Sequence, residues 1–257
     1  CLTDAGELVV ARARRISAEL DALAADVTAI DREVSGTVRV GMIGTTARWL
    51  VPELLSIIPV RFPLLRLVFV EATTAGLDAQ LANGQVDLAV LNLPAAGVEL
   101  RTVPLFEEDL VLVAGADDPL AGRESIDVAE LDGMTLLLPQ AGTAFRDEID
   151  SALRPARVTI HPRAEVDSTR LIASLTFEGC GPAILPASAV PNFLRDQWAL
   201  VPIVGMPPRI VGVALRRRGL LGAPARAVLD VITEVVFDSR RIPSGLRALT
   251  PDQLPHH

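Results

Sequence analysis

The chain begins with a heptad pattern of apolar residues. Its apolar positions alternate at intervals of four and three residues and are Val9, Ala13, Ile16, Leu20, Leu23, Val27, Ile30 and Val34. No proline or glycine interrupts this pattern after Gly6. Such a repeat predicts one long helix with a narrow apolar seam. The helix either pairs between two chains or packs as a single amphipathic helix on its own domain, and the narrow seam favours pairing.

The stretch from residue 36 to residue 58 changes its period at Gly44. Before this glycine, Val38, Val40 and Met42 alternate with less apolar residues, which predicts a strand. After it, apolar residues recur at helical spacing. A helix that starts directly behind a strand points its free N–H groups at the turn, where they suit a carboxylate or another polar group. Thr45 and Thr46 either cap this helix, bind a ligand, or do both.

The next elements alternate between strand and helix. Strands are expected at residues 65–70 and 86–91, with a short helix at 77–83 between them. This βαβαβ order predicts a parallel, doubly wound sheet. Ligands of such sheets bind beyond the carboxyl ends of the strands. The polar residues that follow strands are expected to gather at this edge, and they are Thr45, Thr46, Thr73, Thr74 and Asn92.

A second alternating unit follows a linker signal at residues 114–119. Its expected elements are strands at 135–138, 158–165, 183–185 and 199–204 and helices at 143–153 and 169–177. A strand at 210–215 and an amphipathic helix at 223–237 then return to the first unit. Two crossings between the units make a hinge, and a cleft between two lobes is a natural ligand site.

These patterns divide the chain into four parts. Residues 1–35 are expected to form the dimerisation helix. The first lobe is expected to combine residues 36–115 with residues 207–238, and the second lobe to span residues 116–206. Residues 239–257 are polar and contain three prolines, so we expect a loosely ordered C-terminal tail.

Composition narrows the range of functions. The net charge of −8 argues against a nucleic-acid-binding surface within this stretch. All 24 basic residues are arginine, which excludes Schiff-base chemistry and a phosphate loop with a lysine. His161 is the only histidine before the last two residues, and Cys180, between two glycines, is expected to be a small core residue. We therefore expect no metal, no cofactor and no enzymatic activity, and no apolar run is long enough to span a membrane.

Five motifs carry a resemblance to a known family. They are L-T-D-A-G-E-L at residues 2–8, G-T-V-R-V-G at 36–41, G-Q-V-D-L-A-V at 84–90, E-V-D-S at 165–168 and G-C-G-P-A-I-L-P-A-S-A-V at 179–190. In this order and spacing, over roughly residues 1 to 237, the sequence resembles the LysR-type transcriptional regulators.

The resemblance implies a fold and a function. The fold is an α/β, two-lobed, periplasmic-binding-protein-like (type II) effector domain preceded by a long linker helix. The function is effector sensing and oligomerisation in a cytoplasmic DNA-binding regulator that acts as a homodimer or homotetramer. Promoter DNA would be bound only through the family's N-terminal winged helix-turn-helix domain, which is almost entirely missing from this stretch.

The resemblance also implies an effector site in the cleft. Its residues in the first lobe are Thr45, Thr46, Thr74, Asn92 and Leu93. Those in the second lobe are Gln140, Gly142, Thr143, Ser168 and Thr169. Each of the polar residues is alternatively a plain helix cap. Arg48 and Arg146 are candidates to supply charge to an acidic effector, and we expect a small carboxylate because donors and arginines outnumber acids around this site.

Two other functions are compatible with the same fold. A solute-binding protein of a transport system shares the two lobes, but it would show a signal peptide and lack the heptad helix. An enzyme would need a general base or a nucleophile in the cleft, where candidates are sparse. The heptad helix therefore favours the regulator.

Overall fold

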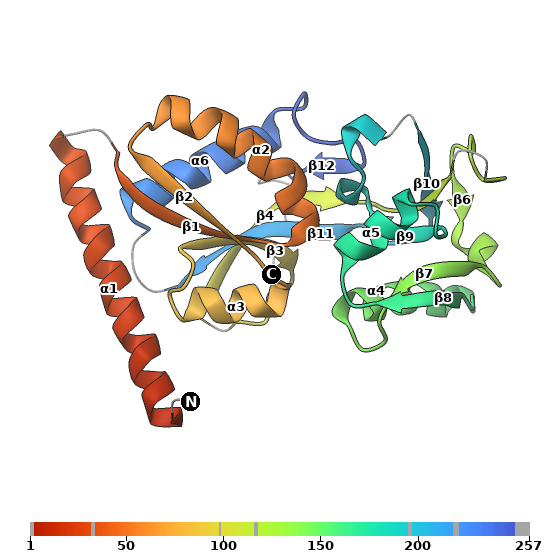
Figure 1. Ribbon diagram of the computed structural model, residues 1–257, viewed down its shortest axis with the longest axis horizontal. Helices are drawn as coiled ribbons and strands as arrows, with labels where there is room; N and C mark the ends of the chain where they lie inside the picture. The colour runs from red at the N-terminus through yellow and green to blue at the C-terminus, as the bar shows by residue number, and fades with distance from the viewer. Residues whose placement is uncertain are drawn as a thin grey trace. The chain divides into compact units, whose positions relative to one another are not determined.

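The computed structural model describes residues 3–31, 34–97, 99–115, 118–194, 197–217 and 221–249 (Figure 1). The chain forms two compact units. Unit 1 comprises Cys1–Phe106, Ile210–Ile242 and Ala248–His257, and unit 2 comprises Glu107–Arg209 and Pro243–Arg247. The sequence analysis placed the boundary between the units at residue 115, whereas unit 2 begins at Glu107. Strand β5 (Leu110–Gly115) therefore belongs to unit 2, as do the strands with which it pairs.

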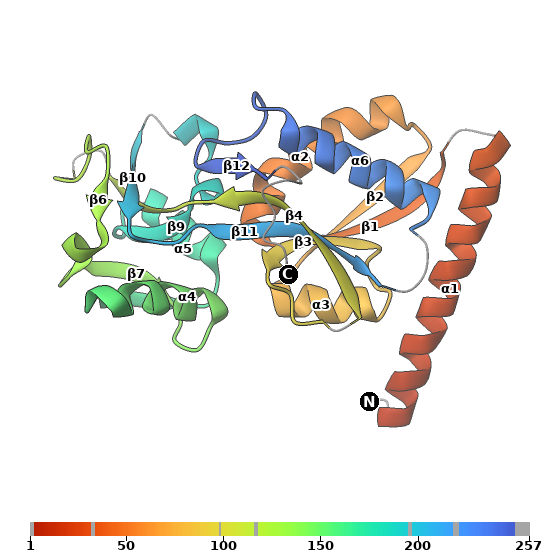
Figure 2. The same cartoon turned by 180° about the vertical axis from the view of Figure 1, so that it is seen from behind.

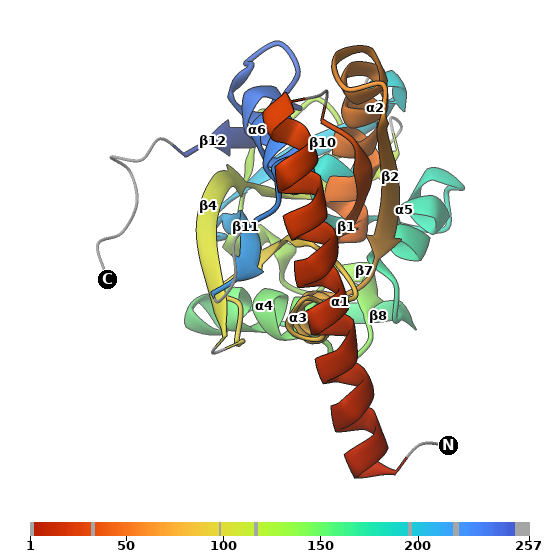
Figure 3. The ribbon, with the colours of Figure 1, turned by 90° about the vertical axis from the view of Figure 1, so that its left-hand side faces the viewer.

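Helix α1 (Asp4–Asp31) is long and uninterrupted (Figure 3). Its apolar seam points to solvent, since Val9, Ile16, Leu20 and Leu23 are each at least 60% exposed. Another face touches unit 1: Arg15 forms a 3.6 Å ion pair with Glu99. The side chains of Val27 and Ile30 lie outside the described residues, and Val34 follows the helix. The described part of the seam is therefore unpartnered within one chain.

Unit 1 is built on a six-stranded sheet in the order β12-β4-β11-β3-β1-β2. Strand β1 pairs in parallel with both β2 and β3, which confirms the doubly wound prediction for these strands. The returning strand β11 runs antiparallel to β3, so the sheet is mixed. The strands are β1 (Gly36–Met42), β2 (Leu65–Glu71), β3 (Leu88–Leu93), β4 (Leu100–Glu108), β11 (Arg209–Arg216) and β12 (Leu246–Ala248).

Three helices cover this sheet: α2 (Gly44–Arg61), α3 (Thr74–Ala82) and α6 (Ala223–Phe237) (Figures 1 and 2). Helix α2 packs beside α6, and α3 lies against β1 and β3. Gly41 allows this close approach, because a Cβ there would lie 2.7 Å from the Leu77 side chain of α3. The buried face of α2 includes Leu50, Leu54 and Ile58, as the helical spacing predicts.

Unit 2 contains a second six-stranded sheet in the order β6-β10-β5-β9-β7-β8. Leu110 and Leu112 of β5 belong to the same buried cluster as Ile149 and Leu153 of α4, so this helix seals one face. Helix α5 packs on β7, β8, β9 and β5. The elements are β5 (Leu110–Gly115), β6 (Ile126–Asp127), β7 (Thr135–Pro139), α4 (Ala144–Leu153), β8 (His161–Val166), α5 (Thr169–Phe177), β9 (Ala183–Pro186), β10 (Trp198–Val204) and four 3₁₀ turns at Val128–Leu131, Arg154–Ala156, Ala187–Ala189 and Asn192–Leu194.

The segment after α6 is more ordered than its composition predicted. Residues 246–248 form β12 at the edge of the first sheet, and Leu249 N donates to Leu105 O at 2.8 Å. Arg241 forms an ion pair with Glu53 of α2. The expectation of a loose tail is wrong for residues 239–249, because Leu246 and Leu249 supply buried apolar anchors. Residues 250–257 lie outside the described residues.

Cys180 also departs from its prediction. It is exposed in the turn that follows α5, not a small core residue. Gly179, with φ of +76°, ends the helix and turns the next side chain away from the core. Among the described helices, none is long and apolar enough to cross a membrane.

Adjacent leucines on α2 test this packing. Leu54 is fully buried, whereas Leu55 is 54% exposed. We expect Leu54→Ala to lower the free energy of unfolding by about 2–5 kcal/mol, because it leaves a cavity in the core. Leu55→Ala is the matched control and should change it by less than about 0.5 kcal/mol. Equal losses in urea unfolding would contradict the burial of this helix face.

Candidate functional site

The candidate residues of unit 1, Thr45, Thr46, Thr74, Asn92 and Leu93, are called half-site 1. They lie at the carboxyl edge of the sheet, because Met42 is in register with both Glu71 and Val90. Ile43 N donates to Val90 O at 3.1 Å, which holds the end of β1 against β3. Asn92 N donates to Thr74 Oγ1 at 3.3 Å. The parallel register therefore brings the ends of three strands together.

Thr45 and Thr46 do not cap α2. The N-cap residue is Ile43, which makes no side-chain cap hydrogen bond, and the two threonines lie within the first helical turn. Likewise, the cap of α3 is Thr73, whose Oγ1 accepts from Gly76 N at 3.3 Å. The capping alternative is wrong for Thr45 and Thr46, because the helix begins at Gly44. Helix α2 thus starts without a side-chain acceptor for its first N–H groups.

Three buried polar atoms without partners belong to α2 and to the end of β3. Among the described residues, Thr46 Oγ1, Trp49 Nε1 and Asn92 Oδ1 are buried and accept or donate no hydrogen bond. Thr46 is fully buried and Thr45 is 6% exposed. Trp49 lies one turn after Thr45 and packs edge-on against Phe106, with ring centroids 5.7 Å apart. Unsatisfied buried polar atoms are costly, so they mark positions where a ligand or an ordered water supplies the missing bonds.

The candidate residues of unit 2, Gln140, Gly142, Thr143, Ser168 and Thr169, are called half-site 2. They follow β7 and β8, which are parallel with Pro139 in register with Val166. Gly142 has φ of +81° and shapes the exposed turn before α4. Thr169 is the first residue of α5. This half-site also lies at the carboxyl edge of parallel strands.

The hydroxyl groups of half-site 2 are engaged locally. Thr143 Oγ1 donates to Gln140 O at 2.7 Å and accepts from Arg146 N at 3.3 Å. Ser168 Oγ accepts from Leu171 N at 3.4 Å and caps α5. Both residues are therefore helix caps in this structure. Their free hydrogen-bonding capacity is smaller than that of Thr46.

Both candidate arginines, Arg48 and Arg146, are already engaged with other groups of this chain. Arg146 bonds Asp150 through Nε, and its Nη1 donates to Pro139 O at 3.1 Å and Glu165 Oε1 at 2.7 Å. These bonds raise the pKa of Arg146, against the opposing effect of its burial. Arg48 is half-buried on α2 and is also engaged with another group. Arg146 therefore serves first to fix α4 to β8.

A buried charged cluster in unit 2 was missed by the sequence analysis. It comprises Glu108, Glu148, Arg209, Phe145 and Ser188. Glu108 is fully buried, and its Oε1 accepts from Ser188 N at 2.9 Å. Arg209 Nε lies 3.2 Å from Glu148 Oε1. The Cζ atom of Arg209 lies over the Phe145 ring, 4.9 Å from its centroid. In the run Glu107-Glu108-Asp109, the alternation of the strand is the one signal that selects the middle residue as buried.

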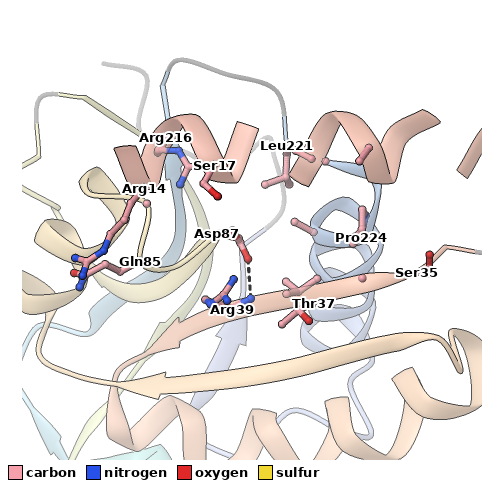
Figure 4. Close-up of a pocket in the computed structure, with 17 residues that line it drawn as sticks. Arg14, Ser17, Ser35, Thr37, Arg39, Gln85, Asp87, Arg216, Leu221 and Pro224 are labelled. Carbon is pink, nitrogen blue, oxygen red and sulfur yellow. Dashed lines mark hydrogen bonds between the residues drawn. The ribbon is translucent and has the colours of Figure 1, made fainter. Parts of the chain in front are cut away.

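A separate cavity of about 790 Å³ lies at the other end of the first sheet (Figure 4). Its polar lining includes Arg14 of α1, Arg39 of β1 and Arg216 of β11, together with Asp87. Arg39 N donates to Asp87 Oδ2 at 2.7 Å. The cavity lining includes no residue of either half-site. Because α1 forms one of its walls, the cavity belongs to the junction of that helix with unit 1.

The contrast between Thr46 and Thr143 is testable without a ligand. Valine matches the shape of threonine but removes the hydroxyl. We expect Thr46→Val to leave the free energy of unfolding unchanged or to raise it, because the buried hydroxyl makes no bond and valine removes that unsatisfied group. Thr143→Val should lose about 1 kcal/mol, because it removes a cap. Chemical unfolding measures both, and a loss for Thr46→Val would show that its hydroxyl has a partner.

Comparison with known proteins places this geometry in a family. Residues 31–236 match the model of the LysR substrate binding domain. The DNA-binding transcriptional dual regulator OxyR of Escherichia coli K12 is 30% identical over 236 residues, covering 91% of this chain and 76% of that protein. A probable hydrogen peroxide-inducible genes activator of Streptomyces viridosporus is 33% identical over 190 residues, covering 74% of this chain and 61% of that protein.

Solved structures agree with this match. A full-length OxyR variant from Pseudomonas aeruginosa superposes with a TM-score of 0.73 at 26% identity, covering 97% of this chain and 80% of that one. The regulatory domain of CcmR from Synechocystis PCC6803, solved in complex with 2-PG, gives a TM-score of 0.70 at 23% identity and covers 80% of this chain and 99% of that one, which shows the shared fold. The chain therefore belongs to the LysR-type transcriptional regulators, with the family's two-lobed, periplasmic-binding-protein-like type II fold.

Proposed function

We propose that this chain is the effector-sensing and oligomerisation part of a LysR-type regulator that binds a small carboxylate between its two lobes. The observation that carries this proposal is half-site 1. There, Thr46 Oγ1 and Asn92 Oδ1 are buried without partners, beside a helix N-terminus that no side chain caps. A helix N-terminus favours an anionic group. The hydroxyl and the indole N–H of Trp49 supply further donors nearby.

The proposed ligand engages both half-sites. Half-site 1 offers unsatisfied side-chain groups, whereas half-site 2 offers the exposed Gln140 and the N-termini of α4 and α5. Thr45, Thr74 and Leu93 shape the first half-site, and Arg48 is the arginine nearest to it in the sequence. A ligand that bonds both lobes favours the arrangement in which both sets of bonds form. That differential affinity shifts the population of conformations, and α1 passes the shift to the DNA-binding domain.

Effector binding can be tested with the chain as it stands. A panel of small carboxylates screened by thermal shift should contain one that raises the melting temperature, because a ligand of the folded state stabilises it. Calorimetry with that compound should show a loss of about 0.5–1.5 kcal/mol in binding free energy for Thr46→Val. Thr102→Val, on the exposed part of β4, is the control and should bind like the wild type. Wild-type affinity in both Thr46→Val and Thr45→Val would place the site elsewhere.

The oligomerisation proposal rests on the exposed seam of α1. Contiguous apolar side chains on a helix are characteristic of a partner surface. We propose a homodimer or homotetramer in which α1 pairs between chains. We further propose that promoter DNA is bound through the domain that precedes the linker helix in this family, and that the regulator works in the cytoplasm.

Replacing Leu20 and Leu23 with glutamine tests this interface. Both side chains are 60% exposed in one chain, so the change should not unfold unit 1. Sedimentation should show a weaker association, with a dissociation constant raised at least tenfold, about 1.4 kcal/mol. The matched control is Leu55→Gln with Leu64→Gln, two leucines of similar exposure away from α1. An unchanged oligomer in the α1 variant would rule out this helix as the main contact.

The peroxide response in the names of several relatives does not supply a better proposal. The two cysteines of this chain are Cys1, outside the described residues, and Cys180. Cys180 is exposed in the turn that follows α5 and belongs to neither half-site. The observations favour reversible binding of a small polar molecule.

A further inference from the structure

The carboxyl group of Glu108 is only half satisfied. The residue is fully buried at the end of β4, and Oε1 accepts from Ser188 N at 2.9 Å. The second oxygen, Oε2, has no hydrogen-bond partner among the described residues, and neither does the hydroxyl of Ser188, which is 2% exposed. A buried carboxylate with an oxygen left without a donor is strongly disfavoured unless it is neutralised.

One guanidinium serves two carboxyl groups. Arg209 has a side chain only 9% exposed, and its Nε lies 3.2 Å from Glu148 Oε1 without hydrogen-bond geometry. The stacking of Arg209 over Phe145 fixes its plane on the α4 side. The same positive charge acts on Glu108. With both carboxyl groups ionised, the buried cluster would carry a net charge of −1.

The other charged groups around Glu108 do not correct this imbalance. Asp109 acts on Glu108 as a second anion. Asp109 is itself neutralised by Arg247 of β12, which makes two bonds of 2.8 Å to it and also approaches Glu107 at 3.4 Å. The 3₁₀ turn at Ala187–Ala189 carries no charged side chain, and Ser188 is its only polar residue. Arg209 is thus the cation with the largest effect on Glu108.

The direction of titration agrees with the geometry. Burial raises the pKa of Glu108, while the charge of Arg209 and the nearby Ser188 oppose the rise only in part. Burial also raises the pKa of Glu148, with a further contribution from the charge of Glu108. Glu148 keeps partial contact with solvent and the nearest approach to Arg209. Glu108 is therefore the group that favours the neutral form.

We propose that Glu108, Glu148 and Arg209 form a proton-binding site in unit 2, in which the buried carboxyl of Glu108 holds a proton more readily than an exposed carboxyl does. The proton comes from solvent and forms the Oε2–H bond of a neutral carboxylic acid, leaving Glu148 and Arg209 as an ion pair. At higher pH the proton returns to solvent, and two carboxylates then compete for one guanidinium.

The position of this site in the chain gives it a regulatory meaning. Glu108 is the second residue of unit 2 after the chain leaves unit 1, and Arg209 is the last residue before the chain returns. The charge state of one cluster therefore acts on two of the segments that cross between the units. This inference does not depend on the identity of the effector or on the carboxylate proposal.

Infrared spectroscopy of the wild type provides the first test. A protonated carboxylic acid has a carbonyl stretch that a carboxylate lacks. We expect this band to persist to a higher pH than the acid bands of the exposed carboxyl groups, and to be lost as the pH rises further. It should be absent in Glu108→Gln and present in Glu124→Gln, an exposed carboxyl of the same unit. In Glu148→Gln the band should disappear at a lower pH, because Arg209 is then free to pair with Glu108.

Stability provides an independent test. A folded-state pKa raised above the unfolded value gives a contribution that is present at low pH and is lost as pH rises through the folded pKa. As the pH rises above the usual range of glutamate pKa values, the wild-type melting temperature should therefore fall more steeply than that of Glu108→Gln, while Glu124→Gln should follow the wild type. The proposal is overturned if the wild type shows no acid band above the pH at which its exposed carboxyl groups have ionised. It is equally overturned if a folded Glu108→Gln variant retains both the band and the wild-type slope.

Discussion

Parallel pairing of β1 with β2 and β3 is the constraint on which the chemistry of unit 1 depends. Because parallel strands end at one edge, the segments after Met42, Glu71 and Val90 are brought together although they are far apart in sequence. The bond from Ile43 N to Val90 O then forces α2 to start at once, with its first N–H groups at the same edge. Polar residues at this edge lie in a field that favours negative charge.

Periodicity in the sequence was sufficient to predict most of the helices and strands, and strand order was sufficient to predict where half-site 1 lies. Neither pattern could tell which polar side chains cap a helix and which are left free to bind a ligand. Thr45, Thr73, Thr143 and Ser168 all stand at junctions between a strand and a helix. The cap falls on Thr73, Thr143 and Ser168, but in α2 the N-cap is Ile43 and Thr45 lies inside the helix. A shift of one or two residues in a helix start decides this, and such a shift depends on tertiary hydrogen bonds that no local pattern records.

The C-terminal segment and Glu108 escaped prediction for a related reason. Polar composition indicated a loose tail, but Leu246 and Leu249 find apolar partners only through long-range packing. Glu108 stands between two other acids, and burial of a carboxyl group contradicts its ordinary preference for solvent. Local rules fail at such positions because tertiary structure overrides them, and these are often the positions that carry function.

Helix α4 connects the two kinds of chemistry found in unit 2. Its N-terminus carries Thr143 of half-site 2, and its next turn carries Phe145 and Glu148, which hold Arg209. Arg209 directly precedes the return of the chain to unit 1. A displacement of α4 by a ligand would therefore change how Arg209 divides its charge between Glu148 and Glu108. Conversely, under the proposal above, a proton on Glu108 would leave the charge of Arg209 to Glu148 of α4. Since both events act on one guanidinium, linkage requires that each changes the free energy of the other.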